Sequence, residues 1–179
     1  ATPSGIDTVS CKLGSGGYAD CTTGITYGTD TPLAEGEYTV TARVTDKAGN
    51  VYTTTYDFTV DLTAPTVSIT SPVDGSATKD TTPTVELAVG VLTGDPSAAT
   101  LNVYAGTTAS GTPTEVAMTK VSGAWTVDLA TLSAGKYTLQ ASVTDDVGNT
   151  ATSTPVTFNV DVTAPTASIG SNRGLRTKE

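Results

Sequence analysis

The chain repeats itself after about 100 residues, and this repeat limits its possible folds more than any other feature. The segment GEYTVTARVTDKAGN at 36–50 recurs as GKYTLQASVTDDVGN at 135–149, and VDLTAPTVSI at 60–69 recurs as VDVTAPTASI at 160–169. The offset is 99 in the first pair and 100 in the second, so one residue is inserted between the two segments. Such self-similarity predicts successive units of one fold.

The composition favours strands over helices. The 179 residues include 39 threonines and 18 glycines, whereas Met, Phe and Trp together supply 4 residues. A β-branched side chain packs well on a pleated surface and disfavours helix. We find no window in which apolar residues keep helical spacing for a dozen residues without Gly, Pro or Thr. We therefore expect an all-β protein, and the apolar fraction of 37% favours small sandwich domains over one large core.

Alternating apolar residues mark the strands. One strand of the first copy has its apolar face at Tyr38, Val40, Ala42 and Val44, and the second copy matches it with Tyr137, Leu139, Ala141 and Val143. In both copies an Asp-x-x-Gly-Asn loop leads into another strand, which predicts an antiparallel hairpin. Seven short strands in about 100 residues indicate tandem immunoglobulin-like β-sandwiches, with Trp125 in the second core. Further strands are expected at 66–70, 84–89, 100–105, 114–121 and 124–128.

The inserted residue has a predicted location. In the first copy the alternation runs unbroken from Tyr52 to Val60, whereas in the second it breaks at Pro155 and resumes at Val156. A slip of one residue would turn the core face outward. We therefore expect a β-bulge or kink at 153–155.

The two copies differ in length. In the second copy 72 residues separate Thr63 from Gly135, whereas only 35 residues precede Gly36. The first copy is therefore expected to lack its opening strands. We predict a partial domain at 1–61, a complete domain at 62–162, and a surplus strand with a tail at 163–179.

Two cysteines, Cys11 and Cys21, flank a Gly-rich centre in CKLGSGGYADC. The segment predicts two short strands joined by a tight turn, and we expect a disulfide between their ends. Such a bridge contributes about 2 to 3 kcal/mol to stability and persists in an oxidising compartment. Free thiols are the alternative; a zinc site is remote because the chain has no His and four ligands cannot be found.

The chain is acidic, with a net charge of −9, and has no dense cluster of Lys or Arg. This charge argues against nucleic acid as a partner. The carboxylates either keep an exposed protein soluble or bind cations. No stretch approaches the roughly 18 apolar residues of a membrane span. The first ten residues lack the features of a signal peptide, so we expect that any signal was removed or lay upstream.

Two repeated strings carry a resemblance to a known family. VTDKAGN…FTVDLTAPTVSITSPVDG and VTDDVGN…FNVDVTAPTASIG resemble the immunoglobulin-like repeats of large bacterial surface adhesins and related extracellular repeat proteins. The segment from Cys11 to Asn50 is similar to a disulfide-bearing version of these repeats. The resemblance covers about two thirds of the chain. It implies a place at the cell surface, a role as spacer or adhesive stalk beside flanking repeats, and calcium at domain junctions.

Calcium is the one cofactor that we expect, because it takes roughly six to eight oxygen ligands and a rigid junction can gather them. The resemblance supports the Asp of the repeated loop and the Asp of the repeated linker. The alternative is that each loop Asp forms an Asx turn and each linker carboxylate caps a strand end. The predicted ligands are Asp46, Asp61 and Asp74 at the first junction, and Asp145, Asp146 and Asp161 at the second.

These features favour a non-enzymatic extracellular structural module. The chain has no His as a general base, no nucleophile elbow and no phosphate loop before a helix, and its carboxylates fall in separate turns. One hypothesis is a spacer, or an excised part, of an adhesin array. Another is a filament subunit in which 163–175 of one molecule adds to the first domain of its neighbour. A third is recognition of a glycan or host protein, which an exposed aromatic cluster would favour. The sequence offers five tyrosines for such a cluster, several of which are better explained as core residues: Tyr18, Tyr27, Tyr52, Tyr56 and Tyr104.

Overall fold

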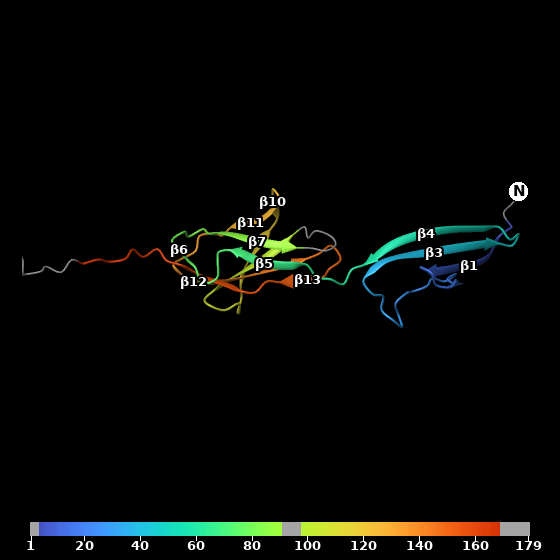
Figure 1. The fold of residues 1–179 in the computed structure, drawn as a ribbon, viewed down its shortest axis with the longest axis horizontal. Helices are drawn as coiled ribbons and strands as arrows, with labels where there is room; N and C mark the ends of the chain where they lie inside the picture. Colours follow the sequence, from blue (N-terminus) through green and yellow to red (C-terminus); the bar gives the residue numbers. More distant parts are fainter. Residues whose placement is uncertain (1–3, 91–97, 169–179) are drawn as a thin grey trace, which may run out of the picture. The chain divides into compact units, whose positions relative to one another are not determined.

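The computed structural model describes residues 4–90 and 98–168, and every regular element in these ranges is a β-strand (Figure 1). The expected all-β class is confirmed. The described residues fall into two compact units. The first holds residues 4–65 with the loop 144–149, and the second holds 66–90, 98–143 and 150–168. The domain limits at 61/62 and 162/163 stay predictions.

The first unit is one antiparallel sheet of four strands in the order β2-β1-β3-β4. The expected hairpin is present, in continuous register from the Gly36–Val60 pair to the Thr45–Val51 pair. Because side chains alternate along a strand, one face of the sheet carries the apolar residues of β1, β3 and β4. The strands are β1 (Ile6–Leu13), β2 (Ala19–Asp20), β3 (Gly36–Asp46) and β4 (Val51–Val60).

The expected disulfide joins Cys11 to Cys21, whose Cα atoms lie 5.7 Å apart. Strands β1 and β2 pair beside it, with Cys11 opposite Ala19. Cys11 is 9% exposed, and it is the only buried residue in strands β1 to β4. The disulfide therefore occupies the place where this unit has its small core.

The second unit is a sandwich of two sheets. One sheet has the order β10-β11-β7-β5, and the other has the order β6-β14-β12-β8-β9, with β13 paired to β12. The expected strands are confirmed, except that 114–121 is interrupted at Thr119; the short β6 was not expected. The strands are β5 (Thr66–Ser71), β6 (Ala77–Thr78), β7 (Thr84–Gly90), β8 (Ala99–Ala105), β9 (Thr114–Met118), β10 (Lys120–Val121), β11 (Ala124–Asp128), β12 (Gly135–Thr144), β13 (Thr150–Thr152) and β14 (Val156–Val160).

Apolar side chains from both sheets meet in the core of the second unit. Val85, Leu101 and Leu139 have no exposed surface, and Phe158 is 1% exposed. Trp125 is 3% exposed, so its expected place in the core is confirmed. Burying each large apolar side chain contributes about 1.5 to 3 kcal/mol. This core is the main source of stability in the second unit.

The expected interruption at 153–155 is confirmed, because β13 ends at Thr152 and β14 begins at Val156. Ser153 holds the two parts in register. Its main-chain N–H donates to the Ala141 oxygen (2.8 Å), and its Oγ accepts the Ala141 N–H (3.0 Å). The kink absorbs the inserted residue and lets the apolar residues of β14 face the core.

Candidate functional site

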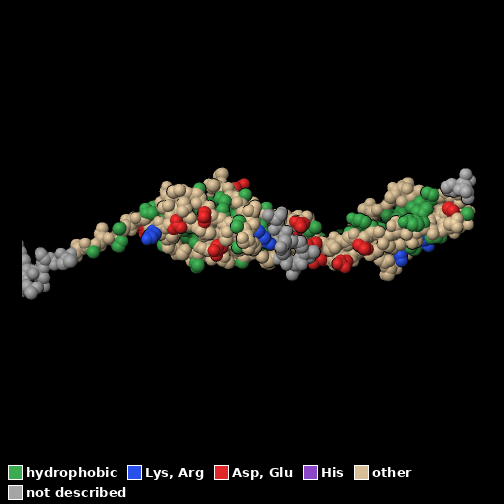
Figure 2. Space-filling view, turned by 90° about the horizontal axis from the view of Figure 1, so that it is seen from above, with side chains coloured by type: hydrophobic (Ala, Val, Ile, Leu, Met, Phe, Trp, Pro, Cys, Tyr) green, Lys and Arg blue, Asp and Glu red, His purple; other side chains and the backbone are tan. Residues whose placement is uncertain are grey.

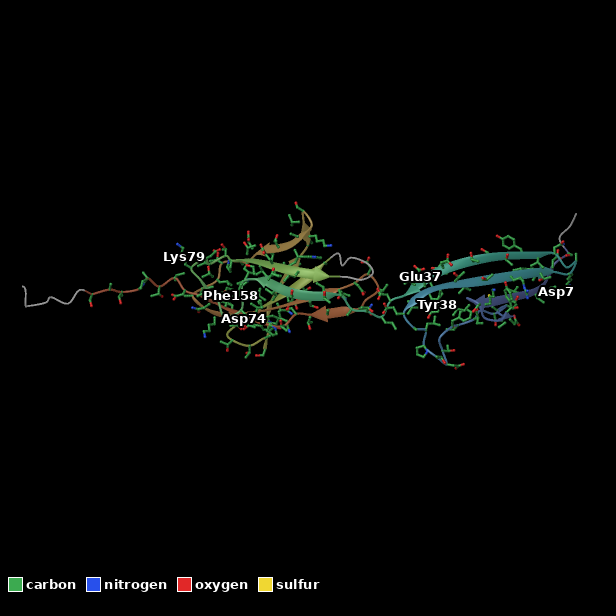
Figure 3. The ribbon with its side chains drawn as sticks, viewed as in Figure 1. Asp7, Glu37, Tyr38, Asp74, Lys79 and Phe158 are labelled. Atoms are coloured by element: carbon green, nitrogen blue, oxygen red, sulfur yellow. A yellow bond between two sulfur atoms is a disulfide. The ribbon has the colours of Figure 1, made fainter. Side chains whose placement is uncertain are left out.

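The same tyrosine contact closes the hairpin in each unit. The Tyr38 hydroxyl donates to the main-chain oxygen of Ala34 (2.9 Å), and the Tyr137 hydroxyl donates to that of Ser133 (3.1 Å). Tyr38 stacks on Phe58 with ring centroids 5.5 Å apart, and Tyr137 packs at 6.0 Å from the Phe158 ring. Figure 3 shows Tyr38 at the start of β3. The repeated sequence thus folds into repeated local geometry.

The loop Asp of the first copy accepts hydrogen bonds from its own loop. Asp46 Oδ1 accepts the N–H groups of Ala48 (2.9 Å) and Asn50 (2.8 Å), and Oδ2 accepts the Asn50 side-chain amide (2.9 Å). Gly49 completes the turn at φ +85°, which only glycine adopts without strain. The donated hydrogen bonds, first of all that of the Asn50 side chain, lower the pKa of Asp46 to about 2.

The loop Asp of the second copy is held in the same way. Asp145 Oδ1 accepts the N–H groups of Val147, Gly148 and Asn149, and Oδ2 accepts the Asn149 amide (2.9 Å). Asp145 is 6% exposed. Burial acts to raise its pKa, but the hydrogen bonds from Asn149, Val147 and Gly148 outweigh burial, so the pKa of Asp145 is lowered. Both loops therefore have the Asx-turn geometry of the alternative hypothesis.

The lowered pKa of Asp46 predicts a dependence of stability on pH. Its stabilising effect should be complete above about pH 4 and lost as the pH falls through about 2, because protonation removes acceptors from the loop. We expect Asp46→Asn to lower the melting temperature of the first unit at about pH 6, and to lower it less at about pH 2. Asp30→Asn, an equal charge change on an exposed side chain, is the control. An NMR titration of Asp46 with a midpoint above about 4 would contradict the assignment.

The linker carboxylates cap the chain locally. Asp61 Oδ1 accepts the N–H of Thr63 (3.0 Å), and Asp161 Oδ1 accepts the N–H of Thr163 (2.9 Å). Within the first unit, the main-chain oxygen of Asp61 also accepts the Asn149 side-chain amide (3.2 Å). The linker residues therefore have the strand-end role of the alternative hypothesis.

The structure does not bring the two expected sets of calcium ligands together. Asp46 and Asp61 lie at opposite ends of β4, a separation of about 33 Å at roughly 3.3 Å per residue. Asp145 follows the last residue of β12, whereas Asp161 follows Val160, which pairs with the first residue of β12. A single cation cannot span either distance.

The donor set also does not fit a calcium cage as it is arranged. Within 4–90 and 98–168, no three His, Cys, Asp or Glu side chains are grouped to hold a metal ion. Asp74 Oδ1 accepts the N–H of Thr157 (2.8 Å), and Asp146 is an exposed loop residue. The carboxylates of both loops are already occupied by amide donors. Calcium binding stays a prediction.

The second unit has a parallel strand pair that joins its opening segment to its last strand. Residues 74–78 run beside 157–161, and β6 pairs with β14 in parallel. Three main-chain bonds join them: Gly75 N–H to Thr157 O (2.7 Å), Asn159 N–H to Ser76 O (2.9 Å) and Asp161 N–H to Thr78 O (2.8 Å). The Asp74 carboxylate adds the fourth bond, to Thr157; Figure 3 labels it on the second unit. We call this set the β6–β14 clamp.

The apolar face of the first unit is open. Tyr52 and Tyr56 of β4 are 69% and 70% exposed, and Val40 and Val44 of β3 are half-buried. Figure 2 shows hydrophobic side chains gathered on the surface of this unit. The buried Cys11 lies on the same face, between Val9 and Leu13 of β1. We call the other apolar residues of this face the open face: Val9, Leu13, Tyr38, Val40, Ala42, Val44, Tyr52, Tyr56, Phe58 and Val60.

The tyrosines thus divide into two groups. Tyr104 is 9% exposed and lies in the core of the second unit, whereas Tyr52 and Tyr56 are exposed. The Arg43 guanidinium carbon lies 3.9 Å from the centroid of the Tyr18 ring, and both side chains line a surface pocket. Thr22 Oγ1, which also lines that pocket, donates to Asp20 Oδ1 (2.6 Å).

Two copies of one hairpin, the second within a β-sandwich, define a protein built from repeated β-modules. The family model of the bacterial Ig-like domain matches residues 7–62 and 64–162, so the chain belongs to the bacterial Ig-like domain family. The resemblance seen in the sequence is therefore confirmed. No curated protein sequence matches the chain.

The chain also matches several solved structures. A tetra-tandem repeat in the extending region of a large adhesion protein has 22% identity and a TM-score of 0.46, covering 90% of this chain and 43% of that chain. The fibronectin(III)-like modules of Clostridium thermocellum CbhA have 15% identity and a TM-score of 0.45, and the match covers 89% of this chain and 78% of that chain. An engineered protein has 27% identity and a TM-score of 0.43, and the match covers 53% of this chain and 20% of that chain. The chain thus spans a fifth of the engineered protein and less than half of the tandem repeat.

Proposed function

We propose that this chain is a non-enzymatic extracellular spacer that carries tension along an array of bacterial Ig-like repeats. The observation that carries the proposal is the β6–β14 clamp. Its four hydrogen bonds, of 2.7 to 2.9 Å, join the first and last segments of the second unit. Flanking repeats of the same array are the expected partners.

The clamp is placed where tension would act. The chain enters the second unit through β5 and β6 and leaves it through β14. Pulling the two ends apart loads parallel neighbouring strands in shear, so the bonds between them must break together. A pair of strands that opened one bond at a time would resist less force. Forced unfolding depends on the barrier to unfolding, and the clamp raises that barrier.

Two features, the disulfide and the acidic charge, support a place outside the cell. The Cys11–Cys21 disulfide suits an oxidising compartment. The acidic composition, with a net charge of −9, favours solubility on an exposed surface. In the part of the chain that the structure describes, no helix is long and apolar enough to cross a membrane.

Single-molecule pulling of the 179-residue chain by its ends tests the spacer role. We expect Asp74→Ala to lower the force at which the second unit unfolds, because it removes the bond to Thr157. Asn159→Pro should lower the force further, since proline lacks the N–H that donates to Ser76. Asp80→Ala is the matched control, because Asp80 caps only Thr82, two residues away. Equal forces for the wild type and all three variants would refute a mechanical clamp.

Recognition of a glycan is a second candidate, favoured by the exposure of Tyr52 and Tyr56. Aromatic faces of this kind can pack against apolar patches of a ligand. Saccharide binding to the full chain, measured by NMR shifts and lost in Tyr52→Thr/Tyr56→Thr, would support this candidate over the spacer role. Absence of any saccharide-dependent shift at the two tyrosines would remove it.

A further inference from the structure

The dipeptide Asp74–Gly75 lies at the start of the β6–β14 clamp, and it is the only Asp-Gly or Asn-Gly pair in the chain. Glycine has no side chain to shield its main-chain nitrogen. In an Asp-Gly pair that nitrogen can therefore attack the carboxyl carbon of the preceding residue. Both residues are exposed to solvent. The pair is thus suited to a covalent rearrangement of the main chain.

The rearrangement needs no reagent other than water. The Gly75 nitrogen bonds to the side-chain carbon Cγ of Asp74, and a five-membered cyclic imide forms. The hydroxyl of the protonated carboxyl group leaves with the Gly75 amide hydrogen as one water molecule. One water molecule then opens the ring at either carbonyl. The product is aspartate again, or isoaspartate, in which the main chain runs through Cβ and Cγ.

The β6–β14 clamp holds both of the reacting groups. The Gly75 N–H donates to the Thr157 oxygen (2.7 Å), so this nitrogen must leave Thr157 before it can lose its hydrogen. The Asp74 Oδ1 accepts the Thr157 N–H (2.8 Å), and the side chain lies beside the start of β14 (Figure 3). One residue of β14 thus occupies the nucleophile and the carboxyl group at the same time.

The turn at 73–76 also holds the main chain in a conformation that cannot cyclise. The Ser76 N–H donates to the Val73 oxygen (3.1 Å), with Asp74 and Gly75 at the centre of the turn. Of these two residues only Gly75 has a positive φ, of +75°. This is the pattern of a type II turn, whose first central residue has ψ of about +120°. Ring closure brings the Gly75 nitrogen into line with the Asp74 Cβ, a rotation of about 120° from that value, which turns the Gly75 N–H away from Thr157.

The clamp can open while the core of the second unit stays folded. Strand β6 is two residues long and lies at the end of its sheet, and among residues 73–78 none is buried. On β14 the clamp residues Thr157 and Asn159 alternate with the core residues Phe158 and Val160. Segments with exposed hydrogen bonds and few buried contacts open at a lower free energy than the whole domain.

We propose that Asp74–Gly75 is a self-modification site that reacts only while the β6–β14 clamp is open, so that its isoaspartate fraction records the time that the clamp has spent open. Isoaspartate adds one carbon to the main chain and moves the free carboxylate from Cβ to Cα. The clamp bonds follow one register from Gly75 to Asp161. The added carbon shifts this register and takes the carboxylate away from Thr157, so the opened state leaves a lasting mark.

Incubation of the 179-residue chain in neutral buffer tests the proposal. Isoaspartate at residue 74 is measured by mass spectrometry after digestion with a protease that cleaves before Asp but not before isoaspartate. We expect the folded chain to isomerise at least about ten-fold more slowly than the chain unfolded in urea, because the rate follows the open fraction of the clamp. In a urea series, isomerisation should accelerate at concentrations below the Trp125 fluorescence transition, which reports unfolding of the core.

A variant that weakens the clamp and leaves the reacting pair intact gives a second test. Asn159→Pro removes the N–H that donates to Ser76 and should speed isomerisation of the folded chain about three-fold or more. Asp80→Ala is the matched control and should not change the rate, because Asp80 caps only Thr82. In urea the three chains should react equally fast. The Trp125 transition checks that Asn159→Pro keeps its core, and the wild-type urea series decides the question without any variant.

A third measurement tests whether the mark persists. The chain is isomerised in urea, refolded by removing the urea, and compared with the unmodified chain by hydrogen exchange. The N–H groups of Thr157 and Asn159 donate to Asp74 and Ser76 in the clamp. Both should exchange at least about ten-fold faster in the isomerised chain, because the altered main chain cannot re-form these bonds.

Three outcomes would overturn the proposal. Equal isomerisation rates in the folded and the unfolded chain would show that the clamp does not protect the pair. Acceleration only together with the Trp125 transition would show that the pair reacts on unfolding of the whole unit and not on opening of the clamp. Unchanged exchange at Thr157 and Asn159 would show that isomerisation leaves the clamp intact. Failure of the pulling test would leave these outcomes as they are, because none of the three measurements applies force.

Discussion

Replacing Phe158 by Ala is expected to lower the free energy of unfolding of the second unit by about 3 to 5 kcal/mol. Phe158 is 1% exposed and lies in the core with Val85, Leu139 and Trp125. Removing its ring leaves a cavity between two sheets, each held by its own hydrogen bonds. The surrounding side chains can fill this cavity only in part, so repacking should recover little of the lost free energy of unfolding.

The repeat supplies an internal control for this substitution. Phe58 occupies the same place in the first copy and stacks on Tyr38, but it is half-buried. We expect Phe58→Ala to lower the free energy of unfolding by less than about half of the loss at Phe158, because the Phe58 ring has less buried surface to lose. Urea denaturation followed by Trp125 fluorescence reports the second unit alone, since Trp125 is the only Trp. Circular dichroism follows both units. Equal costs at the two positions would contradict the difference in burial between the two faces.

The hairpins could be predicted from sequence because two independent signals agree on them. The period-2 alternation places the apolar faces, and the internal repeat supplies the same pattern twice. The kink at 153–155 was also predictable, since a break in the alternation must be absorbed somewhere. Strand β6, Ala77–Thr78, gave no such signal. It is two residues long and is defined by parallel pairing with β14, more than 80 residues away in the sequence.

The candidate site was harder to predict because it depends on distances that spacing does not give. Asp46 and Asp61 are neighbours in the repeat motif, yet a whole strand separates them. The role of Asp74 depends on its hydrogen bond to Thr157, which no local pattern marks. The exposure of Tyr52 and Tyr56 follows from the absence of a covering sheet in the described residues, and alternation shows which face a side chain is on but not what covers it.

Reduction of the Cys11–Cys21 disulfide is expected to destabilise the first unit by about 2 to 3 kcal/mol, through the greater freedom of the unfolded chain. This loss is large for the unit, because small domains with little core have only about 3 to 5 kcal/mol of stability. Cys11 is the only buried residue in strands β1 to β4, and their sheet has an open face. The first unit should therefore unfold in part at room temperature after reduction.

Limited proteolysis with and without reductant measures this effect. We expect cleavage within residues 4–60 to accelerate at least about ten-fold on reduction, as the unfolded population rises. Cys11→Ser/Cys21→Ser should be cleaved as fast as the reduced wild type and should not respond to reductant. The second unit contains no cysteine, so Trp125 fluorescence should report the same urea midpoint in both conditions. Unchanged cleavage of the reduced chain would mean that the hydrogen-bonded sheet is stable without the disulfide, and that the open face is already covered in solution.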